Sequence, residues 1–111
     1  EHLNNYFEIP KNVYFSPFMV FCFRVKEKMR KNMASIVHED FTCRVHTVTE
    51  ADGRYFKLIK EFYRITKIPI ILNTSFNLKG EPIVETPEQA IDDFLKTSLD
   101  YLIIGNFIVS K

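Results

Sequence analysis

The sequence predicts an α/β domain, with α+β as the closely related alternative, in which a mixed sheet is flanked by helices. Three observations favour this class: apolar runs of strand length, two segments with helical spacing of apolar residues, and two short C-terminal strands joined by Gly-Asn. A chain of 111 residues can form one core but not two full-sized ones. We therefore expect a single domain.

The composition is that of a globular domain with an aromatic core. Hydrophobic residues make up 46% of the chain, and eleven phenylalanines and five tyrosines supply large apolar area. The net charge is only +1, and Glu27 and Met29 dilute the basic run at residues 24–31, which favours a solvated face over a nucleic-acid-binding one. The apolar runs are shorter than the ~20 residues of a membrane span, so we expect a cytoplasmic protein. Cys22 and Cys43 lack C-x-x-C spacing and are predicted to be buried, reduced thiols.

The N-terminal half predicts two strands after an extended lead-in at residues 1–17. Residues 18–25 form a nearly continuous apolar run, which predicts a central strand buried on both faces. A second strand is predicted within residues 35–48, where side chains alternate between two faces. One face carries Phe41, Cys43, Val45 and Thr47, and the other carries Thr42, Arg44 and His46.

The C-terminal half predicts two helices and further strands. Helical spacing extends over residues 54–67, with Asp52 as the expected N-cap and an apolar stripe of Tyr55, Leu58, Ile59, Phe62 and Ile65. Strands are expected at residues 68–72 and 81–86. Thr86, Pro87 and Gln89 predict a helix start with a capping box, and the helix should end near Ser98 with a stripe of Ala90, Ile91, Phe94 and Leu95. Residues 101–104 and 107–109 are expected to form a hairpin.

Polar residues directly after the predicted strand at residues 68–72 are candidates for ligand binding. Asn73, Thr74, Ser75 and Asn77 offer amides and hydroxyls at the carboxyl end of a buried strand, where open α/β sheets bind ligands. The alternative is that these side chains only cap turns. No G-x-S-x-G motif surrounds Ser75 and the spacing identifies no base for it, so we expect a ligand-orienting hydroxyl and no protein nucleophile.

Arg44 and His38 each have two interpretations. Arg44 is either a surface arginine with its stem packed down or a fork for phosphate or carboxylate oxygens. His38 is either a turn histidine, which we favour, or a ligand contact. His38, Glu39 and Asp40 are adjacent, but neighbouring residues on an extended chain point apart, so we expect no metal site.

Three segments carry a resemblance to a known family: "SPFM", "VHEDFTCRVHTV" and "IPIILNTSFNLKGEPIVETPEQAIDDFLKTSLDYLIIGNFIV". They resemble the C-terminal domain of the O-carbamoyltransferases, which include the nodulation carbamoyltransferases and those that modify antibiotics. The resemblance covers nearly the whole chain, and "LNTSFN..GEPIV.TP..A" is its most specific string.

The resemblance implies the C-terminal part of a YrdC-like domain, a twisted mixed sheet flanked by helices, truncated at its N-terminus. It also implies that this domain uses ATP with Mg²⁺ and carbamoyl phosphate to form carbamoyladenylate. A preceding Kae1-like domain, which binds a metal ion, would transfer the carbamoyl group to a substrate hydroxyl. By the same resemblance, Arg44 would bind phosphate or carbamoyl oxygens, and Asn73 and Ser75 would contact the nucleotide and the carbamoyl group.

The chain departs from the family pattern at two positions. His46 stands where glutamine is expected, and Phe41 stands where glycine usually follows the aspartate. The family's basic segment and the Kae1-like domain would lie before Glu1, so we expect the isolated chain to bind ATP weakly or not at all and to be inactive. Two rival functions are a nucleic-acid-binding module, because YrdC-like relatives include proteins tied to tRNA modification and double-stranded RNA, and a non-catalytic interaction domain.

Overall fold

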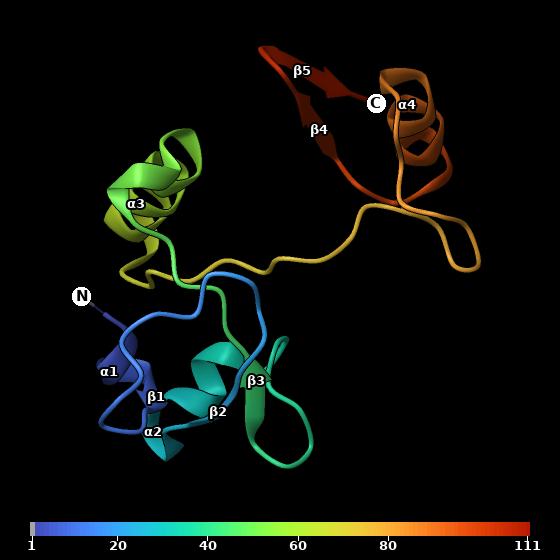
Figure 1. Cartoon of the computed structure of the whole chain (residues 1–111). Helices are drawn as coiled ribbons and strands as arrows, with labels where there is room; N and C mark the ends of the chain where they lie inside the picture. Colours follow the sequence, from blue (N-terminus) through green and yellow to red (C-terminus); the bar gives the residue numbers. More distant parts are fainter. Residues whose placement is uncertain (1) are drawn as a thin grey trace. The chain divides into compact units, whose positions relative to one another are not determined.

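The computed structural model describes residues 2–111, which divide after Leu72 into two compact units (Figure 1). The elements are, in chain order, α1 (Leu3–Tyr6), β1 (Phe7–Glu8), β2 (Cys22–Val25), α2 (Glu27–Arg30), η1 (Lys31–Met33), β3 (Thr42–Arg44), η2 (Glu50–Asp52), α3 (Arg54–Thr66), α4 (Pro87–Lys96), β4 (Tyr101–Ile104) and β5 (Phe107–Ser110). The predicted mixture of helices and strands is confirmed, and the described strands pair as two antiparallel sheets.

The first sheet has the order β1-β2-β3, so the predicted central position of β2 is confirmed. Its burial differs from the prediction, because Phe23 and Val25 are buried whereas Cys22 and Arg24 are exposed. One face of the sheet therefore covers a core and the other faces outward. The core contains Phe7, Phe23, Val25, Met33, Cys43 and Val45. The start of the apolar run is also outside the core, since Phe18 is 81% exposed.

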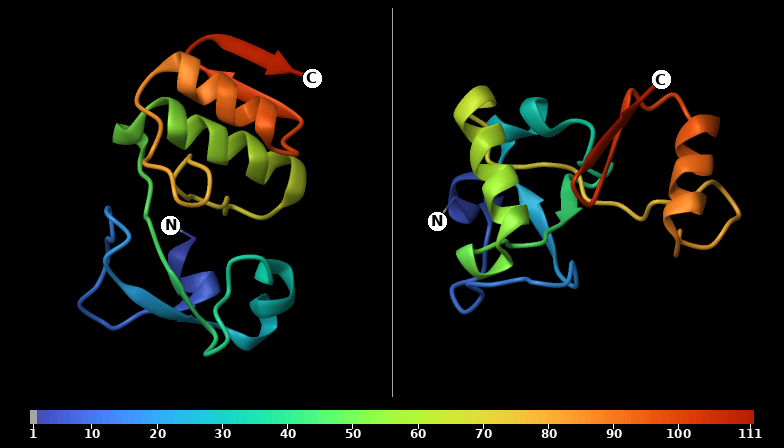
Figure 2. Two further views of the ribbon diagram at one scale, coloured as in Figure 1. Left: turned by 90° about the vertical axis from the view of Figure 1, so that its right-hand side faces the viewer. Right: turned by 90° about the horizontal axis from the view of Figure 1, so that it is seen from above.

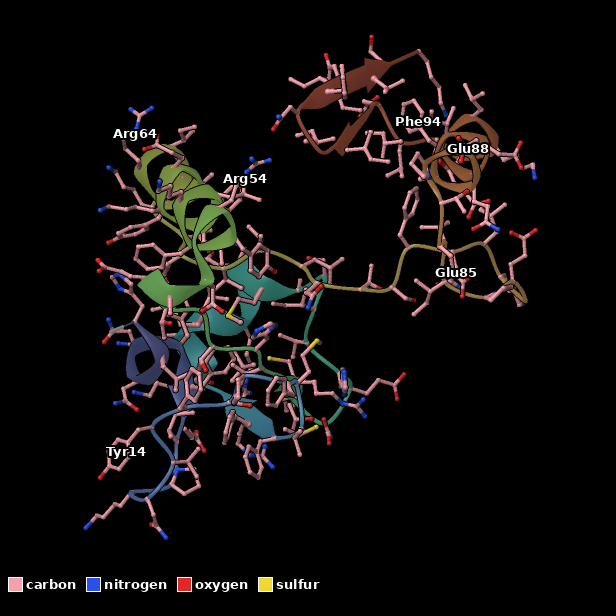
Figure 3. The ribbon with its side chains drawn as sticks, turned by 45° about the horizontal axis from the view of Figure 1, so that its top comes forward. Tyr14, Arg54, Arg64, Glu85, Glu88 and Phe94 are labelled. Atoms are coloured by element: carbon pink, nitrogen blue, oxygen red, sulfur yellow. The ribbon has the colours of Figure 1, made fainter. Side chains whose placement is uncertain are left out.

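The N-terminal segment is more ordered than an extended lead-in. Residues 3–8 form the single turn α1 and the edge strand β1, and Phe7 is buried in the core. The following loop is mostly exposed, and Tyr14 projects from it at 83% exposure (Figure 3). Sequence patterns missed α1 and β1 because elements this short leave no measurable periodicity.

Ser16 links this loop to the chain that continues from β3. Its hydroxyl donates a hydrogen bond to the Val45 carbonyl oxygen at 2.8 Å, and its amide donates to Thr47 Oγ1 at 2.7 Å. The Thr47 amide in turn donates to the Ser16 carbonyl oxygen at 2.8 Å. Ser16 is 1% exposed, so these bonds replace water for every polar group of the residue.

Replacing Ser16 with alanine is expected to destabilise the protein by about 1–3 kcal/mol, because the Val45 carbonyl would lose its side-chain donor in a buried setting. Denaturant unfolding measures this change. Ser35→Ala is the matched control, since Ser35 is exposed, and its effect should stay within about 0.5 kcal/mol. Equal effects of the two substitutions on the free energy of unfolding would contradict a stabilising role for the Ser16 hydroxyl.

Helix α3 confirms the predicted helix, but its predicted cap is wrong and its predicted apolar stripe is only partly buried. Gly53 is the N-cap, while Asp52 instead accepts hydrogen bonds from the Thr49 amide and hydroxyl in the capping box of η2. Three members of the expected stripe are exposed, namely Leu58 at 53%, Phe62 at 38% and Ile65 at 72%. Tyr55 and Ile59, the other two members, are half-buried as predicted, and they are joined by Phe56 and Tyr63.

The strand predicted at residues 68–72 is not present, because these residues pair with no strand in the described part of the chain. Helix α3 ends at Lys67 in the left-handed conformation, with φ of 62°. Pro69 follows and has no amide hydrogen for a ladder. Ile70 packs against the core of the first unit, so the apolar character of the segment reflects packing and not strand pairing. Residues 81–86 likewise form no described strand.

The second unit, residues 73–111, contains a polar loop, α4 and the β4–β5 hairpin, and the two views of Figure 2 show its helix and hairpin in orange and red. The predicted capping box is confirmed: the Gln89 amide donates to Thr86 Oγ1, and the Thr86 amide donates to Gln89 Oε1. Gly105 has φ of 58° at the first turn position, as a type II′ hairpin requires. No helix among residues 2–111 is long and apolar enough to cross a membrane.

Burial in α4 differs in part from the expected stripe. Ala90 and Phe94 are buried as predicted, but Ile91 and Leu95 are 38% and 62% exposed. Asp93 is buried instead. The helix contacts β4, and Figure 3 shows Phe94 on the side of α4 that faces the hairpin. Phe94 is therefore the centre of a small core in this unit.

Candidate functional site

Arg44 lies at the end of β3, on the outward face of the first sheet. Its neighbour Cys43 is 3% exposed and points into the core, whereas Arg44 is exposed, as the predicted alternation requires. Among residues 2–111, the Arg44 side chain forms no ion pair or hydrogen bond within the chain. Its guanidinium is therefore available to an oxyanion.

His46 lies beyond β3, and its ring is half-buried. The ring centroid is 6.1 Å from that of Tyr55 at the start of α3, with an interplanar angle of 49°. The charge of His46 also contributes to lowering the pKa of Asp52, after the larger effect of the hydrogen bonds from Thr49. The histidine therefore contacts the helix that follows the Arg44 strand.

His38 lies in a tight turn that precedes β3. The Phe41 amide donates to the His38 carbonyl oxygen at 2.9 Å, and the His38 amide donates to the Thr42 carbonyl oxygen at 2.8 Å. Asp40 Oδ1 accepts hydrogen bonds from the Thr42 hydroxyl and amide, which lower the pKa of the Asp40 carboxyl. His38 is exposed, so the structure places it as a turn residue, the interpretation favoured from the sequence.

Phe41 occupies this turn in a conformation that glycine prefers. Its φ is 64°, in the left-handed region where a Cβ is strained. This explains why a glycine suits the position. The phenylalanine gains a compensating contact, because the Arg30 guanidinium lies 4.0 Å from its ring centroid.

The Phe41→Gly protein is expected to be more stable than the Phe41→Ala protein by about 1 kcal/mol. Both variants lose the contact with Arg30, but only alanine keeps a Cβ in the strained left-handed conformation. Unfolding of Phe41→Gly and Phe41→Ala measures the difference. At the exposed helical position Lys57 the order should reverse, with alanine favoured by about 1 kcal/mol. Alanine proving better at both positions would contradict a left-handed Phe41.

The polar loop after Leu72 belongs to the second unit. Asn73, Thr74 and Ser75 are all exposed. Asn77 has a structural role, because its Nδ2 donates to the Leu78 carbonyl oxygen at 3.1 Å and to the Glu81 carbonyl oxygen at 3.0 Å.

Backbone hydrogen bonds close this loop. The Glu81 amide donates to the Leu78 carbonyl oxygen, and the Val84 amide donates to the Phe76 carbonyl oxygen, each at 3.0 Å. Gly80 has φ of 90°, which fits the third position of a type II turn. The predicted turn-capping role therefore holds for Asn77, while Thr74 and Ser75 are exposed in the same loop.

The candidate residues thus fall into two groups. Arg44 and His46 lie in the first unit, and Asn73, Thr74, Ser75 and Asn77 lie in the second. Sequence reasoning overlooked Ser16 and Thr47, whose hydrogen bonds fix the chain directly after Arg44. The "SPFM" string marked Ser16, but only the fold shows which carbonyl its hydroxyl meets.

The cysteines differ in environment, which corrects the expectation that both are buried. Both thiols are free, and Cys43 is buried while Cys22 is exposed. Burial, with a smaller effect of Cys22, raises the pKa of the Cys43 thiol to about 11. No group of three or more His, Cys, Asp or Glu side chains within residues 2–111 is arranged to hold a metal ion.

Comparison with known proteins identifies relatives of the whole chain. Residues 1–111 match the family described as carbamoyltransferase C-terminus. The chain is 41% identical over its full length to Nodulation protein NolO of Bradyrhizobium diazoefficiens, covering 20% of that protein, and 38% identical over its full length to Nodulation protein NolNO of Sinorhizobium fredii, covering 16%. It is 42% identical over 90% of its length to Uncharacterized protein MJ1051 of Methanocaldococcus jannaschii, covering 20%. The chain spans about one fifth of the length of these relatives. It belongs to the carbamoyltransferase C-terminus family.

Proposed function

We propose that this chain is part of an O-carbamoyltransferase, in which its domain forms carbamoyladenylate from ATP and carbamoyl phosphate. The observation that carries the proposal is the match of all 111 residues to the carbamoyltransferase C-terminus family. The exposed guanidinium of Arg44 supports it, since adenylation requires cations beside phosphate oxygens.

The proposed reaction has two steps, hydrolysis of carbamoyl phosphate and adenylation of the resulting carbamate. Water displaces the phosphoryl group of carbamoyl phosphate, which leaves as phosphate and yields carbamate. A carbamate oxygen then attacks the α-phosphorus of ATP, and the bond from that phosphorus to the β-phosphate oxygen breaks. Pyrophosphate leaves with the electron pair, and carbamoyladenylate remains. No protein nucleophile takes part.

The roles of the side chains follow from their chemistry. The Arg44 fork would neutralise phosphate or carbamoyl oxygens, and its charge would gain importance as pyrophosphate departs. Asn73 offers an amide that can donate and accept, and Ser75 offers a hydroxyl that can do the same. We assign these two to the nucleotide and the carbamoyl group. Thr74, His38 and His46 are assigned no step.

Mg²⁺ would accompany ATP and offset the charge of its phosphates. The donors of the candidate residues are guanidinium, amide and hydroxyl groups, which do not form the carboxylate cage of a protein-held cation. We therefore assign Mg²⁺ to no side chain of this chain. A Kae1-like domain elsewhere in the full-length protein would carry the metal ion and transfer the carbamoyl group to a hydroxyl, releasing AMP. Because ATP and carbamoyl phosphate are cytoplasmic metabolites, we place the protein in the cytoplasm.

Exchange of labelled pyrophosphate into ATP by the full-length protein tests this function. Exchange should require carbamoyl phosphate, and Ser75→Ala should lower its rate about 10-fold through the loss of one hydrogen bond to a charged group. Ser98→Ala is the control, because Ser98 is also exposed in the second unit. Exchange that proceeds equally without carbamoyl phosphate would contradict the proposal.

A further inference from the structure

Arg24 lies beside Arg44 on the outward face of the first sheet. In the antiparallel pair β2–β3, Cys22 is opposite Arg44 and Arg24 is opposite Thr42. Residues directly opposite each other in such a pair point to the same face, so the two arginines share a face with Cys22, which neighbours both of them. They are diagonal neighbours, a relation that places Cβ atoms roughly 7–8 Å apart and within reach of long side chains. In Figure 1, β2 and β3 lie side by side in the first unit.

Lys26 and Arg30, two other basic residues of the run at residues 24–31, are engaged in contacts within the chain, but Arg24 is not. Lys26 Nζ donates to the Asn4 carbonyl oxygen, and Arg30 Nε donates to the Val25 carbonyl oxygen at 3.2 Å while its guanidinium covers Phe41. Within residues 2–111, Arg24 forms no ion pair or hydrogen bond through its side chain. Arg24 is therefore available to a ligand, whereas Lys26 and Arg30 have structural contacts.

The acidic groups near Arg24 are Glu8 and Asp40. Glu8 is opposite Arg24 on β1, but no salt bridge joins them in the described chain. Hydrogen bonds from Thr42 to Oδ1 lower the pKa of Asp40 most, and the charge of Arg24 lowers it by a smaller amount. Two guanidiniums therefore project from adjacent strands without an ion-paired carboxylate, an arrangement that suits an anion with oxygens on more than one phosphorus.

We propose that Arg24 and Arg44 together hold the β- and γ-phosphates of ATP, which leave as pyrophosphate. The inference rests on the proposed function and adds Arg24 to its site. Arg24 would bind the leaving group and contribute nothing to carbamoyl phosphate recognition. The guanidinium groups of the two arginines would then together neutralise the charge that grows on pyrophosphate as its bond to the α-phosphorus breaks.

Steady-state kinetics of the full-length protein test this assignment. Arg24→Ala should raise KM for ATP about 10-fold or more and leave KM for carbamoyl phosphate unchanged, because a charge-assisted hydrogen bond to phosphate is lost. The KM for ATP of the Arg24→Lys variant should fall between those of the wild type and of Arg24→Ala, since lysine keeps the positive charge but not the guanidinium fork. Glu8→Gln should lower KM for ATP by removing the carboxylate opposite Arg24. Lys28→Ala, an exposed member of the same basic run, should change neither constant.

The outcomes separate this inference from the function on which it rests. If Arg44→Ala raises KM for ATP while Arg24→Ala leaves it within twofold of wild type, the role of Arg24 is wrong and the proposed function stands. If neither variant changes KM for ATP, the outward face of this sheet is not the phosphate site. A rise in KM for carbamoyl phosphate alone would assign Arg24 to the other substrate and overturn the inference.

Cys22 provides a readout that does not depend on activity. Cys22 is exposed, is opposite Arg44 and precedes Arg24 by two residues on the same face, whereas Cys43 is 3% exposed and serves as an internal control. Inorganic pyrophosphate should slow alkylation of Cys22 by iodoacetamide in the full-length protein, followed by peptide mass spectrometry. Sulfate at the same ionic strength should protect less, and Arg24→Ala should remove most of the protection. Equal alkylation rates with and without saturating pyrophosphate would contradict binding at this face.

Discussion

Replacing Phe94 with alanine is expected to lower the free energy of unfolding by about 3–5 kcal/mol, the range for deleting a buried aromatic ring. Phe94 is 0% exposed and lies on the side of α4 that faces the hairpin. Its ring is also covered by Lys111, whose Nζ lies 4.7 Å from the ring centroid and donates to the Thr97 carbonyl oxygen. The substitution would therefore empty the core of the second unit, and β4 and β5 should lose protection from hydrogen exchange.

Leu95→Ala is the matched control for this prediction. Leu95 is the next residue of the same helix but is 62% exposed, so its loss should cost much less, about 1 kcal/mol or below. Denaturant unfolding of both variants, combined with hydrogen exchange at the hairpin amides, compares them directly. If the Phe94 and Leu95 variants unfold at the same denaturant concentration, Phe94 is not the centre of this core.

Replacing Arg44 with alanine is expected to lower kcat/KM of the full-length protein about 100-fold, the cost of removing one donor that stabilises a transition-state charge. The fold should be unaffected, because Arg44 is exposed and makes no ion pair in the described chain. Carbamoyl-phosphate-dependent pyrophosphate exchange measures the activity, and thermal unfolding measures the fold.

Arg64→Ala is the control for Arg44. Arg64 is exposed on α3 and pairs with Glu61 at 2.8 Å, an exposed pair that contributes little to stability. This variant should retain the wild-type rate. Full activity in the Arg44 variant, with an unchanged unfolding temperature, would remove Arg44 from the proposed site.

The elements predicted most accurately are those specified by local chemistry. The Thr86-Pro87-Glu88-Gln89 start of α4 was confirmed because its hydrogen bonds join residues within one turn. The turn at Gly105 was confirmed because glycine has no Cβ and adopts a positive φ without strain. Neither required knowledge of distant parts of the chain.

The strands were harder to predict because pairing depends on residues far apart. An apolar run at residues 18–25 does not reveal that only its last part pairs, or that Cys22 and Arg24 face outward. The segment at residues 68–72 has strand composition, yet in the described chain no strand pairs with it. The composition of a segment indicates that its apolar side chains are to be buried, but it does not indicate which other part of the chain covers them.

The candidate site shows the same division. Alternation along the strand placed Arg44 on the face opposite Cys43. It did not reveal Arg24, because the register between β2 and β3 is set by their pairing and cannot be read from either strand alone. The hydrogen bonds of Ser16 were likewise hidden, since they join it to Val45 and Thr47, which lie far along the chain. The turn-capping bonds of Asn77 are local, and the sequence predicted them as one of two alternatives.

Direct detection of the intermediate tests the central claim most sharply. The full-length protein would be incubated with ATP and ¹³C-labelled carbamoyl phosphate in the absence of a hydroxyl acceptor, and the products would be examined by mass spectrometry. The proposal predicts AMP bearing one ¹³C-carbamoyl group, formed together with pyrophosphate. Carbamoylation of an added acceptor from labelled carbamoyl phosphate without ATP would contradict the claim that this family member proceeds through carbamoyladenylate.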